Sequence, residues 1–373
     1  MSTALFLLLV PAAGTVGSAQ ASTSKNLVVI LVDDGAYAEF GFSNDLFSQG
    51  HVTSTPTIDA LAQSGTIFSQ GYVSAPLCGP SRVGLLTGQY SQRIGYENNI
   101  TTNASTSQGL PAATLTIADH LKALGYTTGM VGKWHLGYQD GVNRPPDAGF
   151  DEFYGMWSGA RSYFPLPSTS SIDQIRRGDV SIESTWRTEG DPSLYDPVKG
   201  RYITDAFGEE SADFINRHAS DEQPFFLYTS MTAPHSPLEV KQEDYDYFDG
   251  LISDPGERTI AAMNHATDRA VGMIHQALQD NNIAENTVIV FLNDNGAPIR
   301  SYDSSPNDPF QGNKGSLWEG GTRVPFFIAG AGASAQVYDQ PVTALDILPT
   351  FVSMAGGDPD GVDTDGVDLT PFL

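Results

Sequence analysis

The amino-acid sequence predicts an α/β fold built on a mostly parallel sheet flanked by helices. Short apolar runs rich in β-branched residues alternate with segments whose apolar residues recur every three or four positions. Strands that alternate with helices in this way form parallel βαβ units. Two apolar runs end in polar clusters, Asp33-Asp34 and Asp294-Asn295. Because ligands of such sheets bind beyond the carboxyl ends of the strands, these clusters indicate where a site lies.

The first part of the chain supplies two predicted strands and three predicted helices. Residues 26–32 (NLVVILV) form a continuous apolar run, which is typical of a strand buried on both faces. A short helix is expected over 55–63, with Pro56 near its first turn, and another begins within 80–86. Apolar residues at helical spacing predict a helix over 114–124, which Gly125 ends, and 126–131 fits the following strand.

The second part of the chain continues the alternation after an irregular region. Residues 157–203 mix Pro, Ser, Arg and Tyr without a clean period, so we interpret them as a loop-rich insertion over a site. Strands are expected at 224–230, 287–292 and 324–329, and a helix at 343–354. The clearest helix is 259–280, because its apolar positions recur at helical spacing along its whole length.

The composition restricts the classes of protein to which the chain can belong. Its 373 residues include 44 acidic and 19 basic side chains, a formal net charge of 19 − 44 = −25 at pH 7. Nucleic-acid binders need a basic surface to meet phosphates, and anionic membranes repel an acidic protein, so neither partner is expected. The hydrophobic content of 40% excludes wholesale disorder. The length fits two domains or one large α/β domain.

The N-terminal residues have the features of a secretory signal. Residues 4–10 form an apolar run, and Ala19-Gln20-Ala21 is a small-x-small cleavage site. We therefore expect residues 1–21 to be removed and the mature protein to be exported, either periplasmic or secreted. No later stretch is long and apolar enough to insert into a membrane. The single cysteine, Cys78, excludes an intrachain disulfide, and a lone thiol in an oxidising compartment suggests a buried or functional side chain.

The two polar clusters at strand ends are candidate metal ligands. Asp33, Asp34, Asp294 and Asn295 offer only oxygen donors, which suit a hard cation such as Ca²⁺ or Mg²⁺. The alternative is that Asp and Asn lie at strand ends because turns favour them. Two such pairs after two buried strands favour the metal site.

Cys78 and Arg82 lie at the start of the helix predicted within 80–86, in the segment Cys78-Gly79-Pro80-Ser81-Arg82. The N-terminal end of a helix attracts an anion, and Arg82 adds a fixed cationic fork. The alternative is a small buried cysteine before a helix, which is the commoner fate of a lone Cys.

Four further residues have the chemistry to bind an anion or to move a proton. Lys133 and His135 follow a strand and, two positions apart in an extended segment, project to the same side. His235 lies between two prolines after another strand, and Lys314 lies in a loop flanked by glycines. Each of these residues taken alone could be an ordinary surface Lys or turn His. Together with Cys78 and the oxygen ligands, they indicate hydrolysis of a charged ester through a covalent nucleophile.

These motifs resemble the type I, formylglycine-dependent sulfatases of the alkaline phosphatase superfamily. Residues 76–82 (PLCGPSR), continuing to Leu85-Leu86-Thr87-Gly88, fit the C-x-P-S-R signature of that family, and residues 125–135 (GYTTGMVGKWH) fit its second signature. The resemblance runs from about Lys25 to the end of the chain. It implies an alkaline-phosphatase-like sheet flanked by helices, with a signal peptide over 1–21 and a sulfatase catalytic domain over 22–373.

The resemblance also implies a chemical mechanism. A formylglycine-generating maturation enzyme would oxidise Cys78 to Cα-formylglycine, whose aldehyde hydrates to a gem-diol. Asp33, Asp34, Asp294 and Asn295 would hold one Ca²⁺, which also contacts the diol of residue 78 and the sulfate. One diol oxygen would attack sulfur as the alcohol leaves, forming a covalent sulfoenzyme intermediate. The second hydroxyl would then expel sulfate and regenerate the aldehyde.

The roles of the remaining residues follow from the same resemblance. Arg82 and Lys133 would stabilise the formylglycine oxygens, and Lys133 and Lys314 would neutralise the sulfate. His235, with help from Lys314, would protonate the leaving oxygen, and His135 would deprotonate the diol. Preorganised cations act most strongly on developing negative charge where water is excluded, so these roles agree with the physical chemistry of the reaction.

Finer similarities suggest a sulfated polysaccharide or oligosaccharide as the substrate. Residues 89–97 and 317–325 are similar to bacterial enzymes that act on sulfated algal glycans, and residues 233–238 are similar to N-acetylgalactosamine-4-sulfatases and arylsulfatases. Members of the family usually continue into a smaller C-terminal subdomain. Because this sequence ends at Leu373, we expect that subdomain to be missing or truncated.

Four arginines in the predicted loops beside the site are candidate substrate ligands. We expect some of Arg161, Arg176, Arg177 and Arg300 to bind neighbouring sulfates or uronates, forming a local basic cleft inside an acidic shell. Two other functions remain open at this point. One is hydrolysis of phosphonate monoesters or phosphodiesters by the same type of site, and the other is non-catalytic, Ca²⁺-dependent binding of sulfated glycans.

Overall fold

A computed structural model describes residues 24–47, 50–101, 108–165, 170–183, 201–303 and 306–373. The expected signal peptide over 1–21 lies outside the described residues, as does part of the expected insertion over 157–203. Among the described residues, none of the helices combines the length and the apolar character that crossing a membrane requires.

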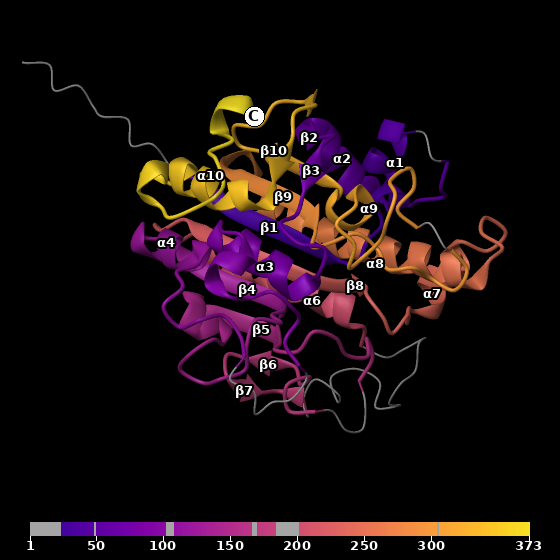
Figure 1. Cartoon of the computed structure of the whole chain (residues 1–373), viewed down its shortest axis with the longest axis horizontal. Helices are drawn as coiled ribbons and strands as arrows, with labels where there is room; N and C mark the ends of the chain where they lie inside the picture. The colour runs from indigo at the N-terminus through magenta and orange to yellow at the C-terminus, as the bar shows by residue number, and fades with distance from the viewer. Residues whose placement is uncertain (1–23, 48–49, 102–107, 166–169, 184–200, 304–305) are drawn as a thin grey trace, which may run out of the picture.

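The centre of the molecule is a ten-stranded sheet whose strands follow the order β11-β2-β10-β9-β1-β8-β4-β5-β6-β7. The five middle strands, β9, β1, β8, β4 and β5, are parallel, whereas β10 runs antiparallel to both β9 and β2. In Figure 1, β1 lies in the middle of the sheet beside β9. The strands of this sheet span β1 Asn26–Asp33, β2 Thr66–Phe68, β4 Thr127–Lys133, β5 Glu152–Met156, β6 Arg176–Arg177, β7 Val180–Ser181, β8 Phe225–Pro234, β9 Thr287–Asn293, β10 Phe326–Gly330 and β11 Gln336–Tyr338.

Helices cover both faces of this sheet (Figure 1). One face carries α3 (Cys78–Thr87), α4 (Ile117–Ala123) and α10 (Ile347–Met354), and the other carries α2 (Pro56–Ser64), α6 (Ile203–His218) and α8 (Pro255–Asp280). Shorter elements complete the described chain: α1 Gly41–Phe47, α7 Gln242–Tyr247, α9 Glu319–Thr322, the strand pair β3 Gly71–Tyr72 and β12 Val342–Thr343, and 3₁₀ turns at Tyr37–Glu39, Ser91–Ile94, Pro145–Ala148, Ala284–Asn286, Ala344–Asp346, Pro359–Gly361 and Thr370–Phe372.

The core consists of two apolar layers separated by the sheet. Successive side chains of a strand point to opposite faces, so Leu27, Val29 and Leu31 of β1 enter one layer and Val28, Ile30 and Val32 enter the other. All six side chains are at most 1% exposed. The continuous apolar run of β1 therefore reflects burial on both faces, as the sequence predicts.

Most of the predicted elements are confirmed, with shifts of a few residues at their ends. The helix predicted over 114–124 begins at Ile117, because the side chain of Thr116 caps it and Asp119 completes the capping box. The helix predicted over 343–354 begins as a 3₁₀ turn, and α10 itself starts at Ile347.

Two elements of the central architecture were not predicted. The helix α6 begins where the expected insertion ends, and its mixed sequence carries an apolar stripe that includes Ile203, Phe207 and Phe214. That spacing was a usable helical signal. The strand β5 is short and contains Glu152 and Gly155, so its sequence alone does not distinguish it from a loop.

Candidate active site

The candidate site forms where the parallel strands end. The register of β1 pairs Val32 with Asn293 of β9 and Asp33 with Pro234 of β8. The residues that follow these strands therefore meet at one edge of the sheet, as expected for carboxyl ends of parallel strands. The helix α3 begins at this same edge and brings Cys78 to Asp33, with the thiol sulfur 3.6 Å from Oδ1 of the carboxylate.

The oxygen ligands predicted from sequence do come together. Asp34 adopts a left-handed backbone conformation with φ of 64°, so the chain turns sharply after β1. Its backbone N–H donates to Oδ1 of Asp294 at 3.3 Å, and its Oδ1 accepts a 2.7 Å hydrogen bond from Nδ2 of Asn295. Asp33, Asp34, Asp294 and Asn295 are at most 4% exposed.

Three cations neutralise the three buried carboxylates. Lys133 Nζ donates to Asp33, and Lys314 Nζ donates to both oxygens of Asp34 at 2.6 and 2.8 Å. Arg82 donates to Asp294 through Nε at 3.0 Å and through Nη2 at 2.8 Å. Arg82 Nη2 also lies 3.6 Å from Oδ2 of Asp33. Buried charges persist only when they are paired, so the carboxylates depend on these cations. Burial tends to lower the pKa of Lys314, but Asp34 and neighbouring acidic groups outweigh this effect and raise the pKa, which keeps the side chain charged.

The donor set fits a hard divalent cation. Side-chain donor atoms of Asp33, Asp34, Cys78 and His235 all lie within 4.8 Å of one another. Asn295 uses its amide nitrogen in hydrogen bonds, and its buried Oδ1 has no hydrogen-bond partner among the described residues. A buried carbonyl-type oxygen without a donor is costly unless a cation takes the place of that donor.

The thiol of Cys78 is a poor nucleophile in this environment. The side chain is 1% exposed and lies 3.0 Å from Lys314 Nζ. Burial raises the pKa of Cys78 well above its ordinary value, and Asp294 and Asp33 add to that effect while Lys133 opposes it. Because the thiolate and not the thiol is reactive, the unmodified side chain is held in an inert form.

The two histidines predicted as proton carriers lie at the same edge. His235 Nδ1 is hydrogen-bonded to the carbonyl of Ser236, and Nε2 lies 3.7 Å from Oδ2 of Asp34. His135 is buried, and its Nδ1 has no hydrogen-bond partner among the described residues. Burial, followed by the charges of Lys133 and Arg82, holds the pKa of His135 well below its ordinary value. His135 is therefore held in its neutral form, with an unprotonated ring nitrogen available.

Several contacts that position the site escaped sequence reasoning. Ser230 of β8 accepts a hydrogen bond from Arg82 and donates one to the carbonyl of Lys133 at 2.7 Å. Tyr96 donates through its hydroxyl to the carbonyl of His135 at 3.0 Å, and Asn99 Oδ1 accepts from the backbone N–H of Gly79 at 2.8 Å. None of the three has a spacing or motif that indicates such a contact. Each acts through partners that are distant in sequence.

The four arginines expected to bind substrate are engaged within the chain. Arg161 is buried and forms a bidentate ion pair with Glu183, and Arg177 forms an ion pair with Glu210. Arg176 packs over the ring of Trp157 and donates to backbone carbonyls. Arg300 pairs with Glu39 and donates to the carbonyl of Asp34 at 3.3 Å, so it lies at the edge of the site. Substrate binding by these arginines stays a prediction that the geometry does not favour.

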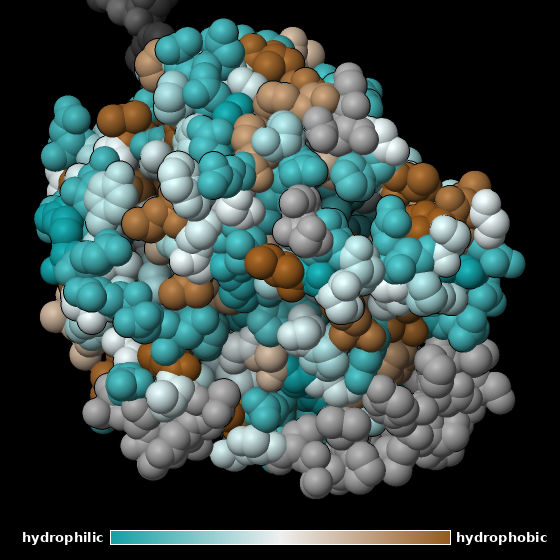
Figure 2. All heavy atoms as spheres, turned by 45° about the vertical axis from the view of Figure 1, so that its right-hand side comes forward, coloured by the Kyte–Doolittle hydropathy of each residue, from teal (hydrophilic) through white to brown (hydrophobic). Residues whose placement is uncertain are grey.

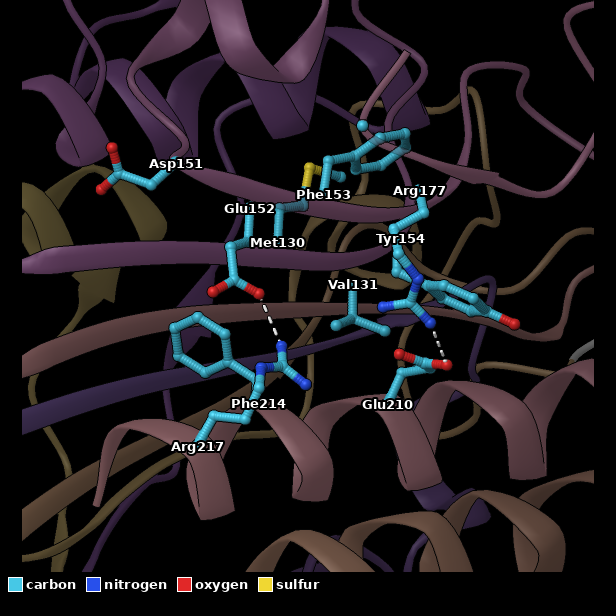
Figure 3. A pocket seen from close by; sticks show the side chains of 11 residues that line it. Met130, Val131, Asp151, Glu152, Phe153, Tyr154, Arg177, Glu210, Phe214 and Arg217 are labelled. Carbon is cyan, nitrogen blue, oxygen red and sulfur yellow. Dashed lines mark hydrogen bonds and ion pairs between the residues drawn. The ribbon is translucent and has the colours of Figure 1, made fainter. Parts of the chain in front are cut away.

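A separate hollow of about 460 Å³ lies between β4, β5 and α6 (Figure 3). Its floor is apolar, with Val131 and Phe214, and two ion pairs cross it, Arg217–Glu152 and Arg177–Glu210. None of the residues in the carboxylate and cation cluster lines it. We therefore locate the chemistry at the strand ends and not in this hollow.

Comparison with known proteins identifies related sequences along nearly the whole chain. The family model described as Sulfatase matches residues 25–357. The chain is similar to N-acetylgalactosamine-6-sulfatase of Canis lupus familiaris, with 32% identity over 98% of this chain and 69% of that protein. It is also 30% identical to arylsulfatase J of Mus musculus, over 96% of this chain and 56% of that protein. The chain thus spans about 56% to 69% of the length of these curated relatives.

Comparison with solved structures also identifies similar proteins along nearly the whole chain. The chain is similar to Ps i-CgsB, solved in complex with k-i-k-neocarrahexaose, with 34% identity, a TM-score of 0.82 and coverage of 93% of this chain and 76% of that one. It is also similar to the PsFucS1 sulfatase from Pseudoalteromonas sp., with 26% identity, a TM-score of 0.73 and coverage of 94% and 72%.

Proposed function

The chain belongs to the sulfatase family and is a sulfuric ester hydrolase by class, and we propose that it desulfates a sulfated polysaccharide or oligosaccharide. The observation that carries the proposal is the convergence of Cys78, three carboxylates and three cations at one buried edge of the sheet. The similarity to a structure solved with a carrageenan hexasaccharide, at 34% identity, supports a glycan as the substrate. The net reaction consumes one water and releases an alcohol and inorganic sulfate.

The nucleophile is residue 78 after a maturation enzyme has converted the cysteine to Cα-formylglycine. The raised pKa of the Cys78 thiol supports this step, because the unmodified side chain has little thiolate with which to attack sulfur. The hydrated aldehyde would supply an oxygen nucleophile at the N-terminal end of α3. Arg82 and Lys133, both fully buried, would hold the oxygens of residue 78 in place.

One Ca²⁺ would be held by Asp33, Asp34, Asp294, Asn295 and residue 78, and when bound it would polarise the sulfate and the nucleophilic oxygen. The orphaned Oδ1 of Asn295 supports this ligand set. Lys314 and Lys133 would bind the remaining sulfate oxygens, because both ammonium groups already lie beside the carboxylates that surround residue 78. Cations fixed in a site without bulk water act strongly on developing charge.

The two histidines would each move a proton, in different steps of the reaction. His235 is partly exposed, with Nε2 directed to Asp34, so it would donate a proton to the leaving alcohol oxygen at the opening of the site. His135 is buried and neutral because of its lowered pKa, so it would take the proton that is lost when sulfate is expelled.

Sulfate release tests the proposal directly. The full chain is co-expressed with a formylglycine-generating enzyme, supplied with Ca²⁺, and assayed on carrageenan, ulvan, fucoidan, chondroitin and heparan oligosaccharides, an aryl sulfate and an aryl phosphodiester. We expect sulfate release from one glycan by the wild type and none by Cys78→Ala. Mass spectrometry of the peptide that contains residue 78 reports its conversion. Converted protein that releases no sulfate, or that prefers the phosphodiester, would refute the proposal.

Export is a separate part of the proposal. Residues 1–21 have the pattern of a signal peptide, and the mature protein is expected to be periplasmic or secreted. N-terminal sequencing of the protein recovered after expression in a secreting host would begin near Ser22. A mature protein that retains Met1 would contradict it.

A further inference from the structure

The catalytic cluster opens to solvent through few side chains. Lys314 and His235 are 16% and 19% exposed at their side chains, whereas Cys78, Arg82 and Lys133 are at most 1% exposed. A saccharide whose sulfate reaches residue 78 must therefore lie against the loops that carry Lys314 and His235. Those loops form the rim of the site.

Large apolar side chains are exposed on the loop that carries Lys314 and on the neighbouring loop that follows Asn295. Leu317 and Trp318, three and four residues after Lys314, are 86% and 61% exposed. Ile299, four residues after the candidate ligand Asn295, is 61% exposed. Single exposed apolar residues are ordinary on protein surfaces. On the face drawn in Figure 2, hydrophobic residues form separate groups on a mostly hydrophilic surface. Here three of them occur on two loops that belong to the same site.

The two loops are packed on each other and on the strand ends. The backbone N–H of Lys314 donates to the carbonyl of Ala297 at 3.0 Å, and that of Gly296 donates to the carbonyl of Gly321 at 3.1 Å. The N–H of Gly315 donates to the carbonyl of Pro76, two residues before Cys78, at 2.8 Å. The segment that carries Leu317 and Trp318 is thus fixed relative to the nucleophile.

The backbone of Trp318 is held while its ring remains exposed. Gly312 has a positive φ of 98°, and a Cβ at that position would lie 2.7 Å from Cβ of Trp318, so the glycine allows close packing of the loop. The carbonyl of Trp318 accepts from the N–H of Gly321 at 2.8 Å and from the Thr322 hydroxyl at 3.3 Å. These contacts order the residue before any ligand binds, which lowers the entropic cost of binding.

Outside the buried cations assigned to the sulfate, two arginines near the site are already engaged in ion pairs. Arg300 is 8% exposed at its side chain and pairs with Glu39, and Arg161 is 2% exposed and pairs with Glu183. The chain as a whole carries a net charge of −25. A sulfated saccharide therefore gains little from long-range attraction, whereas the C–H face of a pyranose ring can cover an indole ring.

We propose that Trp318 is the stacking platform for a pyranose ring of the saccharide substrate, with the exposed Leu317 and Ile299 adding apolar surface on the same two loops. The inference rests on the proposed sulfatase function and deepens it, because it assigns the affinity for the sugar to an apolar rim and the chemistry to the buried cluster. It makes Trp318 a specificity residue and not a catalytic one.

The test separates affinity from chemistry. On the glycan that the converted wild type desulfates fastest, Trp318→Ala is expected to raise KM about tenfold with kcat nearly unchanged, the effect of losing roughly 55 Å² of apolar contact. Trp318→Phe keeps an aromatic face and is expected to recover most of the loss. Phe372→Ala, which removes a 43% exposed aromatic ring that packs on Tyr338 of β11, is the matched control and leaves KM unchanged.

A second measurement does not depend on turnover. Calorimetric binding of k-i-k-neocarrahexaose and of the panel glycans is compared between Cys78→Ala and the double variant Cys78→Ala, Trp318→Ala, and weaker binding by the double variant supports the platform. An unchanged KM in Trp318→Ala, or a lower kcat with KM preserved, overturns the inference and leaves the sulfatase proposal intact. Two results together would overturn both the stacking platform and the sulfatase proposal. These are a converted wild type that is inactive on every sulfate ester, and a Cys78→Ala protein that binds none of these glycans.

Discussion

At the scale of single residues, Asn295 is the side chain that most directly tests the proposed metal site. Its Nδ2 donates to Asp34 and to the carbonyl of Gly296, so its buried Oδ1 is left to face the cluster of carboxylates. We expect Asn295→Ala to lower Ca²⁺ affinity at least about tenfold, because one neutral oxygen ligand is lost while the three carboxylates remain. Isothermal titration of Ca²⁺ into protein treated with EGTA measures this affinity.

Asn143→Ala is the control for that measurement, because Asn143 is a buried amide outside the cluster. Its Ca²⁺ affinity should equal that of the wild type. Equal affinities of Asn295→Ala and the wild type would remove Asn295 from the ligand set. Chelation of Ca²⁺ should abolish sulfate release by the wild type.

Asn99 acts on the nucleophile through the backbone. The residue before α3, Leu77, has no side-chain oxygen with which to cap the helix, and Asn99 accepts from the N–H of Gly79 instead. A lost cap costs about 1 kcal/mol, so Asn99→Ala is expected to lower kcat about fivefold with a smaller change in KM. Steady-state kinetics on the preferred glycan measures both constants.

Asn98→Ala provides the matched comparison, since Asn98 is an exposed amide one position earlier with no hydrogen bond to α3. It should behave as the wild type. An equal loss of kcat in both variants would mean that the loop tolerates no substitution, and the specific role of Asn99 would be wrong.

At the scale of elements, β5 and α6 are joined by an ion-pair network at the hollow of Figure 3. Glu152 of β5 pairs with Arg217 and with His218 of α6. Burial of Glu152 tends to raise its pKa, but hydrogen bonds from His218 and Arg217 outweigh this effect and lower the pKa below its ordinary value of 4.5. A carboxylate whose pKa is lower in the folded state stabilises the fold above the unfolded pKa, and this contribution is lost as pH falls through the folded pKa.

We therefore expect Glu152→Gln to destabilise the protein at pH 7, and this effect to disappear as the pH falls through the lowered folded-state pKa of Glu152, because the wild-type carboxyl is then as neutral as the amide. Urea unfolding at a series of pH values measures the difference in the free energy of unfolding. Glu97→Gln, which alters an exposed carboxylate outside this network, should show no such pH-dependent difference. A constant difference between Glu152→Gln and the wild type across the series would contradict the linkage.

At the scale of the whole molecule, the net charge of −25 opposes compaction. Like charges on a surface repel, and the distance over which they do so falls from about 10 Å at 0.1 M salt to about 3 Å at 1 M. We expect the thermal unfolding midpoint to rise when NaCl is increased from 0.05 to 0.5 M, in the presence of EGTA so that Ca²⁺ binding does not contribute. Differential scanning calorimetry measures this midpoint.

Choline chloride at equal ionic strength should give a similar rise, because screening does not depend on the identity of the cation. A midpoint that stays constant or falls with both salts would show that surface repulsion contributes little to the stability of this fold. A rise with NaCl alone would indicate specific cation binding.

The sequence by itself determined the fold class and most of the candidate site. A continuous, β-branched apolar run such as residues 26–32 is typical of a strand buried on both faces, and acidic residues directly after such a strand lie at its carboxyl end. The segment around Cys78 fixed the start of α3 by its local sequence. These features depend on neighbours within one or two turns of chain, which a sequence displays directly.

Only the tertiary structure decided which charges are paired. Arg82 meets Asp294 across 212 positions, and Arg300 meets Glu39 across 261. The first pair builds the site, whereas the second occupies an arginine that the sequence suggested for substrate. The sequence does not show whether an arginine in a loop is paired with a carboxylate. Such pairing depends on the strand order of the sheet, which brings distant segments together. The exposure of Trp318 likewise follows only from the tertiary structure, because the sequence does not show which apolar side chains remain exposed to solvent.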